Sequence, residues 1–243
     1  MYSIEQKITV ISEDVMSDVT NQRVESLFKL VPASLLTLED DWLKYQPKTI
    51  AEMKFKNMVE DAIKSGIKDF WRPVCDPSFD DNGCICYEPG KKPAVGKSYN
   101  WWKENAKNFC PERGSRLGTK FEYVAFQAVL IKELVASGKS LSWAWNAVCS
   151  DSFALGHYWN SENAKYAFEN TGSREICGWY DLANSNKILM EDQEADVFWF
   201  AGGCYGNFSS FNSLTNLYHC YKCNEDNSIS CGWLVLPEGN TVH

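Results

Sequence analysis

The sequence predicts an α+β protein with short strands, two or three helices and long ordered loops, preceded by a small N-terminal segment. Apolar residues recur at helical spacing in a few bounded segments, and short aromatic or aliphatic runs are typical of buried strands. The chain of 243 residues also has 10 Trp and 14% aromatic residues. Large side chains of this kind can pin long loops to a core.

The clearest helix near the N-terminus is expected to begin after Thr49. Thr49 and Glu52 have the spacing of a capping box, in which each side chain bonds the other's backbone amide. Apolar residues then recur at helical spacing, and Gly66 supplies a C-terminal stop. The pattern therefore predicts one helix of about four turns.

Residues 1–70 are interpreted as a partly helical segment that mounts or oligomerises the rest of the chain. A short strand is predicted over residues 8–11, and a shorter helix over residues 21–30 that Pro32 ends. The following stretch, residues 72–98, is rich in Pro, Gly, Asp and Asn, which favour turns. We therefore place the boundary of the main domain near residue 71, so that this domain covers residues 71–243.

The main helix of that domain is predicted over residues 119–135. Thr119 and Glu122 form a second capping-box pattern, and Gly138 follows the last apolar position. Further helices are predicted over residues 142–148 and 161–168.

Two short buried strands are predicted over residues 197–200 and 233–236. They flank a segment of unusual composition, residues 204–231, which we name the variable cassette. We expect an edge of a sheet to carry this cassette as loops and short strands. The scaffold residues beside it are expected to be Trp199, Gly202, Gly203, Gly232 and Trp233.

The composition of the variable cassette is the most informative feature of the chain. Of its 28 residues, 18 are Asn, Ser, Tyr, Cys or Asp, whereas only Lys222 and Glu225 come from the set Lys, Glu, Gln, Met and Trp. Those five types make up 53 of the 203 residues before Cys204, a frequency that would place about seven in a window of this length. The cassette is therefore both enriched in Asn, Ser, Tyr, Cys and Asp and depleted of Lys, Glu, Gln, Met and Trp.

Randomisation of DNA at adenines explains this bias. A codon of the form AAY, changed at its first two bases, can encode Asn, Ser, Tyr, Cys, Asp, Phe or His, but never Lys, Glu, Gln, Met or Trp. Ordinary exposed loops are also rich in Ser and Asn. That alternative does not account for four Cys and two Phe in the same cassette, or for the scarcity of Lys and Glu.

The cassette is predicted to bind a ligand through its side chains. Tyr and Phe offer large, rigid contact areas, and Ser and Asn offer adaptable hydrogen bonds, as in antibody loops. The expected ligand-binding residues are Cys204, Tyr205, Asn207, Phe208, Ser209, Ser210, Phe211, Asn212, His219, Cys220, Tyr221, Cys223, Asn224, Asp226, Asn227, Ser228 and Ser230.

Net charge and patterning exclude several classes of partner. A net charge of −8 disfavours binding to nucleic acid phosphates, and no apolar run approaches the length of a membrane span. No basic start followed by an apolar core is present, so we expect no secretory signal and synthesis in the cytoplasm. Ten Cys in such a chain are expected to be mostly free thiols.

Three motifs, in order, resemble the formylglycine-generating-enzyme branch of the C-type lectin fold. Residues 116–123 (RLGTKFEY) are similar to that family's opening of its main helix, residues 200–205 (FAGGCY) to its Gly-Gly turn, and residues 232–236 (GWLVL) to its closing strand. Within this branch, the combination with an Asn/Ser/Tyr-rich C-terminal cassette resembles the variable proteins of diversity-generating retroelements.

This resemblance implies a binding protein that performs no chemistry. In such systems, a reverse transcriptase copies a template with errors at adenines, and the copy replaces the cassette. We expect no catalytic residues, no cofactor and no metal. The ligand would be a protein or glycan on a cell surface, and the chain could be displayed as a homo-oligomer on a phage virion or another surface assembly, where avidity strengthens weak contacts.

Two other interpretations remain open. Cys220 and Cys223 have zinc-ligand spacing, with His219 and two further Cys nearby, which would suit a zinc-stabilised interaction module. The enzymes of the resembled family use a C-terminal cysteine pair for copper-dependent oxidation, so a copper- or thiol-dependent oxidase is the enzymatic alternative.

Two further residue groups could have a role in a site. An acidic stretch that includes Asp181, Glu191, Asp192, Glu194 and Asp196 could form a solvated loop or a calcium site. His157 is expected to be a packed core residue rather than a catalytic base.

Overall fold

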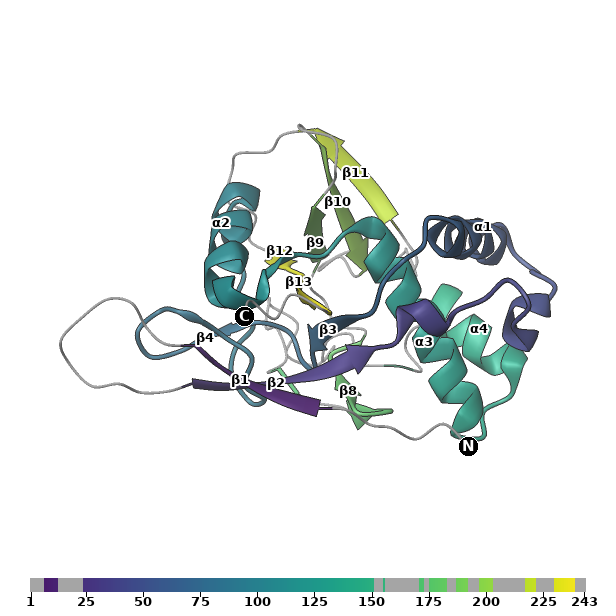
Figure 1. Cartoon of the computed structure of the whole chain (residues 1–243), viewed down its shortest axis with the longest axis horizontal. Helices are drawn as coiled ribbons and strands as arrows, with labels where there is room; N and C mark the ends of the chain where they lie inside the picture. Colours follow the sequence, from purple (N-terminus) through teal and green to yellow (C-terminus); the bar gives the residue numbers. More distant parts are fainter. Residues whose placement is uncertain are drawn as a thin grey trace, which may run out of the picture.

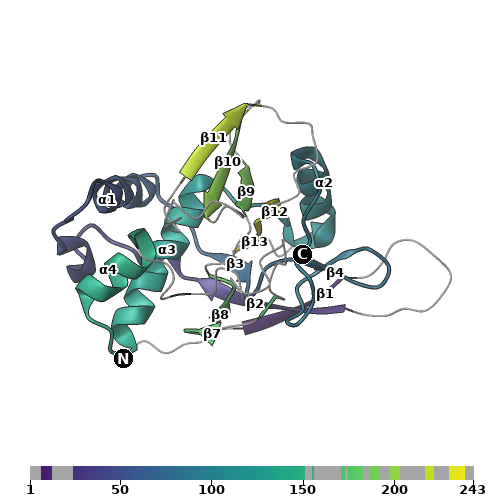
Figure 2. The same cartoon turned by 180° about the vertical axis from the view of Figure 1, so that it is seen from behind.

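The protein has a mixed α+β fold with four α-helices and small, largely antiparallel sheets in the part that the structure describes. The computed structural model describes residues 7–12, 24–150, 155, 171–172, 175–182, 187–191, 197–202, 217–221 and 230–238. The helices α1, α3 and α4 gather on one side of the strands and α2 lies on the other, as both views show (Figures 1 and 2). No helix in these ranges is long and apolar enough to cross a membrane.

The larger sheet has five strands in the order β1-β2-β3-β13-β6, and every pairing in it is antiparallel. Its strands are β1 (Lys7–Ser12), β2 (Val24–Val31), β3 (Phe70–Pro73), β6 (Arg116–Leu117) and β13 (Leu234–Pro237).

The smaller sheet has four strands in the order β11-β10-β9-β12. Its strands are β9 (Lys187–Glu191), β10 (Val197–Gly202), β11 (Leu217–Tyr221) and β12 (Ser230–Gly232). Two hairpins complete the strands, formed by β4 (Ser78–Phe79) with β5 (Ile85–Cys86) and by β7 (Glu175–Ile176) with β8 (Trp179–Tyr180).

The helices begin and end where local sequence signals place them. Their bounds are α1 (Ile50–Lys64), α2 (Tyr99–Phe109), α3 (Lys120–Ala136) and α4 (Leu141–Cys149), with short 3-10 turns at η1 (Ala33–Leu35), η2 (Asp41–Lys44) and η3 (Pro111–Arg113).

Both predicted capping boxes are confirmed. The Thr49 and Thr119 side chains each accept a hydrogen bond from the amide three residues on, and the Glu at that position bonds back. Gly66 and Gly138 follow the helix ends with φ of +71° and +95°, a region that disfavours side chains. The helix predicted over residues 142–148 is confirmed as α4. The one predicted over residues 161–168, like His157, lies outside the described residues.

The helix predicted over residues 21–30 is wrong, because the chain forms β2 there. Phe28 pairs with Ile8 of β1 on one side and with Pro73 of β3 on the other. Ser26, Phe28 and Lys29 are all buried. Burial on both faces of a central strand produces an apolar run whose period resembles that of a helix. The short strand predicted over residues 8–11 is confirmed as β1.

The hydrophobic core is shared by segments from the whole described chain. Phe28 of β2 and Phe55 of α1 belong to the same buried cluster as Trp102 of α2, Leu130 of α3 and Trp233. Strands from before and after residue 70 also pair in the five-stranded sheet. The division of the chain near residue 71 and the mounting role of its first part stay predictions.

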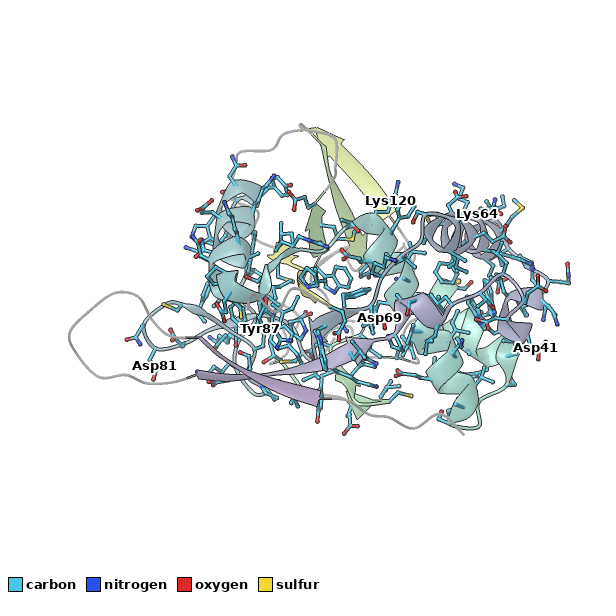
Figure 3. All side chains as sticks on the ribbon, viewed as in Figure 1. Asp41, Lys64, Asp69, Asp81, Tyr87 and Lys120 are labelled. Carbon is cyan, nitrogen blue, oxygen red and sulfur yellow. The ribbon has the colours of Figure 1, made fainter. Side chains whose placement is uncertain are left out.

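Aromatic side chains link the helices to the strands. Tyr87 lies between α2 and the long β1–β2 pair (Figure 3), with its ring 5.8 Å from Phe28 and 5.4 Å from Phe109. On the other side, the Trp145 ring of α4 stacks on Tyr45 at 4.9 Å and meets Phe55 of α1 edge-on at 5.5 Å. Edge-to-face contacts of this kind add to the energy of area burial.

Candidate functional site

The four-stranded sheet carries the described parts of the variable cassette. β10 contains Trp199 and Gly202, and β11 lies at one edge of the sheet and contains His219, Cys220 and Tyr221. Ser230 begins β12. The remaining predicted site residues lie outside the described residues: Gly203, Cys204, Tyr205, Asn207, Phe208, Ser209, Ser210, Phe211, Asn212, Cys223, Asn224, Asp226, Asn227 and Ser228.

The strand register brings the two ends of the cassette together. Gly202, at the end of β10, pairs with Lys187 of β9, and Ser230, at the beginning of β12, pairs with the same Lys187 from the other side. Leu217 pairs with Ala201 and begins β11. The chain therefore leaves and re-enters the sheet along one row of residues, and β11 divides the part of the cassette before β12 into two stretches, residues 204–216 and 222–229.

The backbone of β12, where the chain returns to the sheet after the cassette, is in close contact with the ring of Trp102. A Cβ atom on Gly232 would lie 2.6 Å from Cε3 of Trp102 and 3.0 Å from Cδ2 of Leu117. Trp102 belongs to α2 and is fully buried. Only glycine allows β12 to pass this close to α2, which ties the sheet of the cassette to that helix.

Trp233 occupies the junction between β12 and β13. It is 4% exposed, and its ring lies 5.2 Å from Tyr123, 5.9 Å from Phe70 and 6.4 Å from Phe126. A Cβ atom on Gly118 would lie 2.1 Å from its Cε3 atom, so the backbone of residue 118 packs flat against the indole. The strand predicted over residues 233–236 is present as β13, displaced by one residue.

A partly buried ion pair fixes the beginning of α3 against β6. The Arg116 guanidinium donates to both carboxylate oxygens of Glu122, at 2.7 and 2.8 Å. The same carboxylate accepts from the Thr119 amide at 2.8 Å. Burial lowers the pKa of Arg116, but its hydrogen bonds to Glu122 and the charges of Glu122 and Glu191 together outweigh this effect, so that the pKa is raised overall. A bidentate pair adds geometric specificity, so this motif serves the scaffold.

Cys231, the last residue of the cassette, is a core residue. It is a free thiol that is 1% exposed. Burial raises its pKa well above the usual value, and the charges of Asp76 and Asp181 act in the same direction. A thiol of this kind is neutral and poorly nucleophilic at neutral pH. The part of the cassette able to face a ligand therefore ends before Cys231.

Cys231 is expected to resist alkylation in the native protein. The raised pKa lowers the fraction of thiolate, the form that reacts, and burial also blocks access of the reagent. With iodoacetamide at pH 8, we expect labelling more than about tenfold slower than after unfolding in guanidinium, as measured by peptide mass spectrometry. Cys84, a half-buried residue in a turn, is the control. Rapid labelling of native Cys231 would contradict its core position.

The acidic residues of the predicted calcium stretch that the structure describes have protein partners. The Asp181 carboxylate accepts hydrogen bonds from the amides of Asp76 at 3.0 Å and Gly172 at 2.9 Å. Glu191 forms an ion pair with Lys103 of α2 at 2.8 Å. Asp192, Glu194 and Asp196 lie outside the described residues, and within the described part no group of three His, Cys, Asp or Glu residues could hold a metal ion.

Sequence reasoning missed a buried charged cluster around Arg72. Arg72 of β3 is 2% exposed, and the buried carboxylates of Asp76 and Asp181 act on it electrostatically. Its guanidinium lies 4.1 Å from the Phe126 ring and 5.3 Å from the Trp179 ring. Arg72 stands in a turn-rich stretch of sequence, where nothing indicates burial, and Asp181, Phe126 and Trp179 come from distant segments.

No protein-family model and no curated protein matches the chain. Two solved structures are similar to it at low levels. The crystal structure of CarF has a TM-score of 0.44 and 12% identity, covering 96% of this chain and 98% of that chain. The structure of PvdO from Pseudomonas aeruginosa has a TM-score of 0.40 and 12% identity, covering 95% and 90%. Both TM-scores are below 0.5, a likeness that does not identify a shared family.

Proposed function

We propose that this chain is a non-enzymatic ligand-binding protein with a C-type lectin-like fold, whose variable cassette is diversified by a retroelement. The observation that carries the proposal is the composition of residues 204–231, in which Asn, Ser, Tyr, Cys and Asp make up 18 of 28 residues and only Lys222 and Glu225 represent five otherwise common types. The ligand is a protein or glycan on a cell surface.

The arrangement of the scaffold supports this proposal. A diversified surface has to be separated from the residues that stabilise the fold, because substitutions at exposed positions cost little stability and core substitutions cost much. The described residues at the two ends of the cassette pair in one sheet, and its last residue, Cys231, is buried together with Gly232 and Trp233, which follow it. The segment proposed to vary, residues 204–230, is therefore flanked on both sides by residues that belong to the folded scaffold.

The chemistry of the buried thiols also favours a binding role. Reactive cysteines depend on a lowered pKa, whereas burial raises the pKa of Cys75, Cys86 and Cys231. Neighbouring carboxylates raise the pKa of Cys75 and Cys231 further. These three thiols are unsuited to act as nucleophiles at neutral pH.

The origin of the cassette is tested by sequencing the DNA around the gene. The expected result is an adjacent reverse-transcriptase gene and a near-copy of the last ~100 bases that differs mainly opposite adenines, as the composition of the cassette implies. A gene without such a copy, whose homologues in related strains have an unchanged cassette, would overturn the proposal.

The separation of binding from folding is tested by replacing residues 204–230 with a second permuted set that keeps the same length. Because exposed substitutions each change stability by only about 0.5 kcal/mol or less, we expect a nearly unchanged melting temperature and a loss of binding. Binding is measured on an array of cell-surface glycans and on intact cells of the natural host. The matched scaffold variant is Trp233→Ala, for which a large fall in melting temperature is expected. Unfolding of the cassette variant would contradict the model.

A further inference from the structure

A small cavity lies behind β12, between the end of β3 and the junction of β12 with β13. Its volume is about 10 Å³, the size that one water molecule needs. The polar and ionisable groups that line it belong to Arg72, Cys75, Asp76, Tyr87, Cys231 and Trp233. It therefore adjoins the point at which the variable cassette returns to the core.

Two lining side chains carry buried donors that lack a hydrogen-bond acceptor within the described part of the chain. These donors are Nε and Nη1 of Arg72 and Nε1 of Trp233. The stacking of Arg72 on Phe126 uses the face of the guanidinium and supplies no acceptor for Nε and Nη1, whose N–H groups point outward in its plane. A buried charged donor without an acceptor carries a large desolvation penalty, so the cavity needs an acceptor.

The charges around the cavity favour a neutral occupant. Burial lowers the pKa of Arg72, and the nearby charges of Asp76 and Asp181 oppose that shift. An arginine remains protonated in proteins. Burial raises the pKa of Cys75, Cys231 and Tyr87, so all three are neutral at neutral pH. An anion would face the carboxylate of Asp76, and a cation would face the guanidinium of Arg72.

We propose that this cavity binds one water molecule as a permanent part of the scaffold. The water accepts hydrogen bonds from Arg72 and donates to the polar lining, in which the Asp76 carboxylate is the strongest acceptor. Buried waters typically make about three hydrogen bonds to groups that have no other partner. The water thereby links β3 to the backbone of residues 231–234, whatever sequence the cassette has.

The experiment is a pair of crystal structures of the full chain at high resolution, one grown without halide and one soaked in bromide. The expected result is a single peak within hydrogen-bond distance of Nε or Nη1 of Arg72 that refines as water and shows no anomalous signal in bromide. An anomalous peak in the cavity would overturn the proposal in favour of an anion. An empty cavity, or an Arg72 side chain bonded directly to Asp76 through those nitrogens, would also overturn it.

A solution measurement provides an independent test. In the wild-type protein, a long-lived water in the cavity is expected to give nuclear Overhauser effects to the amides of residues 231–234 and to the indole N–H of Trp233. The indole N–H of Trp143, on the half-buried side of α4, is the control, because only rapidly exchanging solvent reaches it. Absence of the effect at Trp233, with the folded protein intact, would show that no water is retained.

Discussion

Replacement of Arg72 by methionine is expected to lower the free energy of unfolding by about 3–5 kcal/mol. The substitution preserves most of the aliphatic stem but removes a positive charge that interacts with the carboxylates of Asp76 and Asp181. Both carboxylates are buried, and a buried charge left without its partner is strongly destabilising. Loss of the stacking on Phe126 and Trp179 acts in the same direction. Urea titration followed by tryptophan fluorescence measures the change.

Arg113→Met is the matched control for this prediction. The Arg113 guanidinium lies 5.9 Å from the Trp71 ring but is only half-buried, so its loss is expected to cost less than about 1 kcal/mol. An equal decrease in the free energy of unfolding for the two variants would show that burial of Arg72 has no special energetic role. A more stable Arg72→Met protein would mean that the desolvation penalty of the cluster exceeds its internal attraction.

Replacement of Trp233 by alanine is expected to destabilise the protein by about 3–5 kcal/mol. Trp233 packs edge-on against Phe70 and Tyr123 and covers the backbone of Gly118. Its removal leaves a cavity at the meeting point of β3, α3 and β13, where rigid elements leave little room for collapse. The change is measured by the same urea titration, with circular dichroism to verify that the variant folds.

Two variants make this second prediction specific. Trp143→Ala removes a half-buried indole from α4, and a clearly smaller loss is expected. Trp233→Phe retains an aromatic ring and removes Nε1, which has no protein acceptor in the described ranges, so it is expected to cost less than Trp233→Ala. A Trp233→Ala variant with wild-type stability would contradict the core position of this side chain.

The helices could be predicted well because the hydrogen bonds that cap a helix join residues that are close in sequence. Thr49 and Thr119 each bond a residue three positions away, so the sequence alone contains both partners. The helix α2 has an equally local N-cap, in which Ser98 accepts from the Trp101 amide. We predicted no element for residues 99–109, which lie between the turn-rich stretch 72–98 and the helix predicted from residue 119.

Features that depend on contacts between distant segments could not be predicted in the same way. β2 was mistaken for a helix because the two strands that pair with its edges, β1 and β3, are separate segments of the chain whose pairing no local signal reveals. The contact of the Asp76 amide with Asp181 spans 105 residues. For the candidate site, composition indicated the cassette, but only the structure placed Cys231 in the core.

Gly118 connects the five-stranded sheet to the four-stranded sheet through its backbone. The Gly118 amide donates to the carbonyl of Trp233 at 2.7 Å, beside β13, and the Gly118 carbonyl accepts from the amide of Glu191 at 2.9 Å, at the end of β9. Opening of the sheet that carries the cassette therefore strains the sheet that holds the core. The backbone amides of residues 118 and 191 should exchange with deuterium as members of one cooperative unit, so that fluctuations of the four-stranded sheet are limited by the stability of the whole fold.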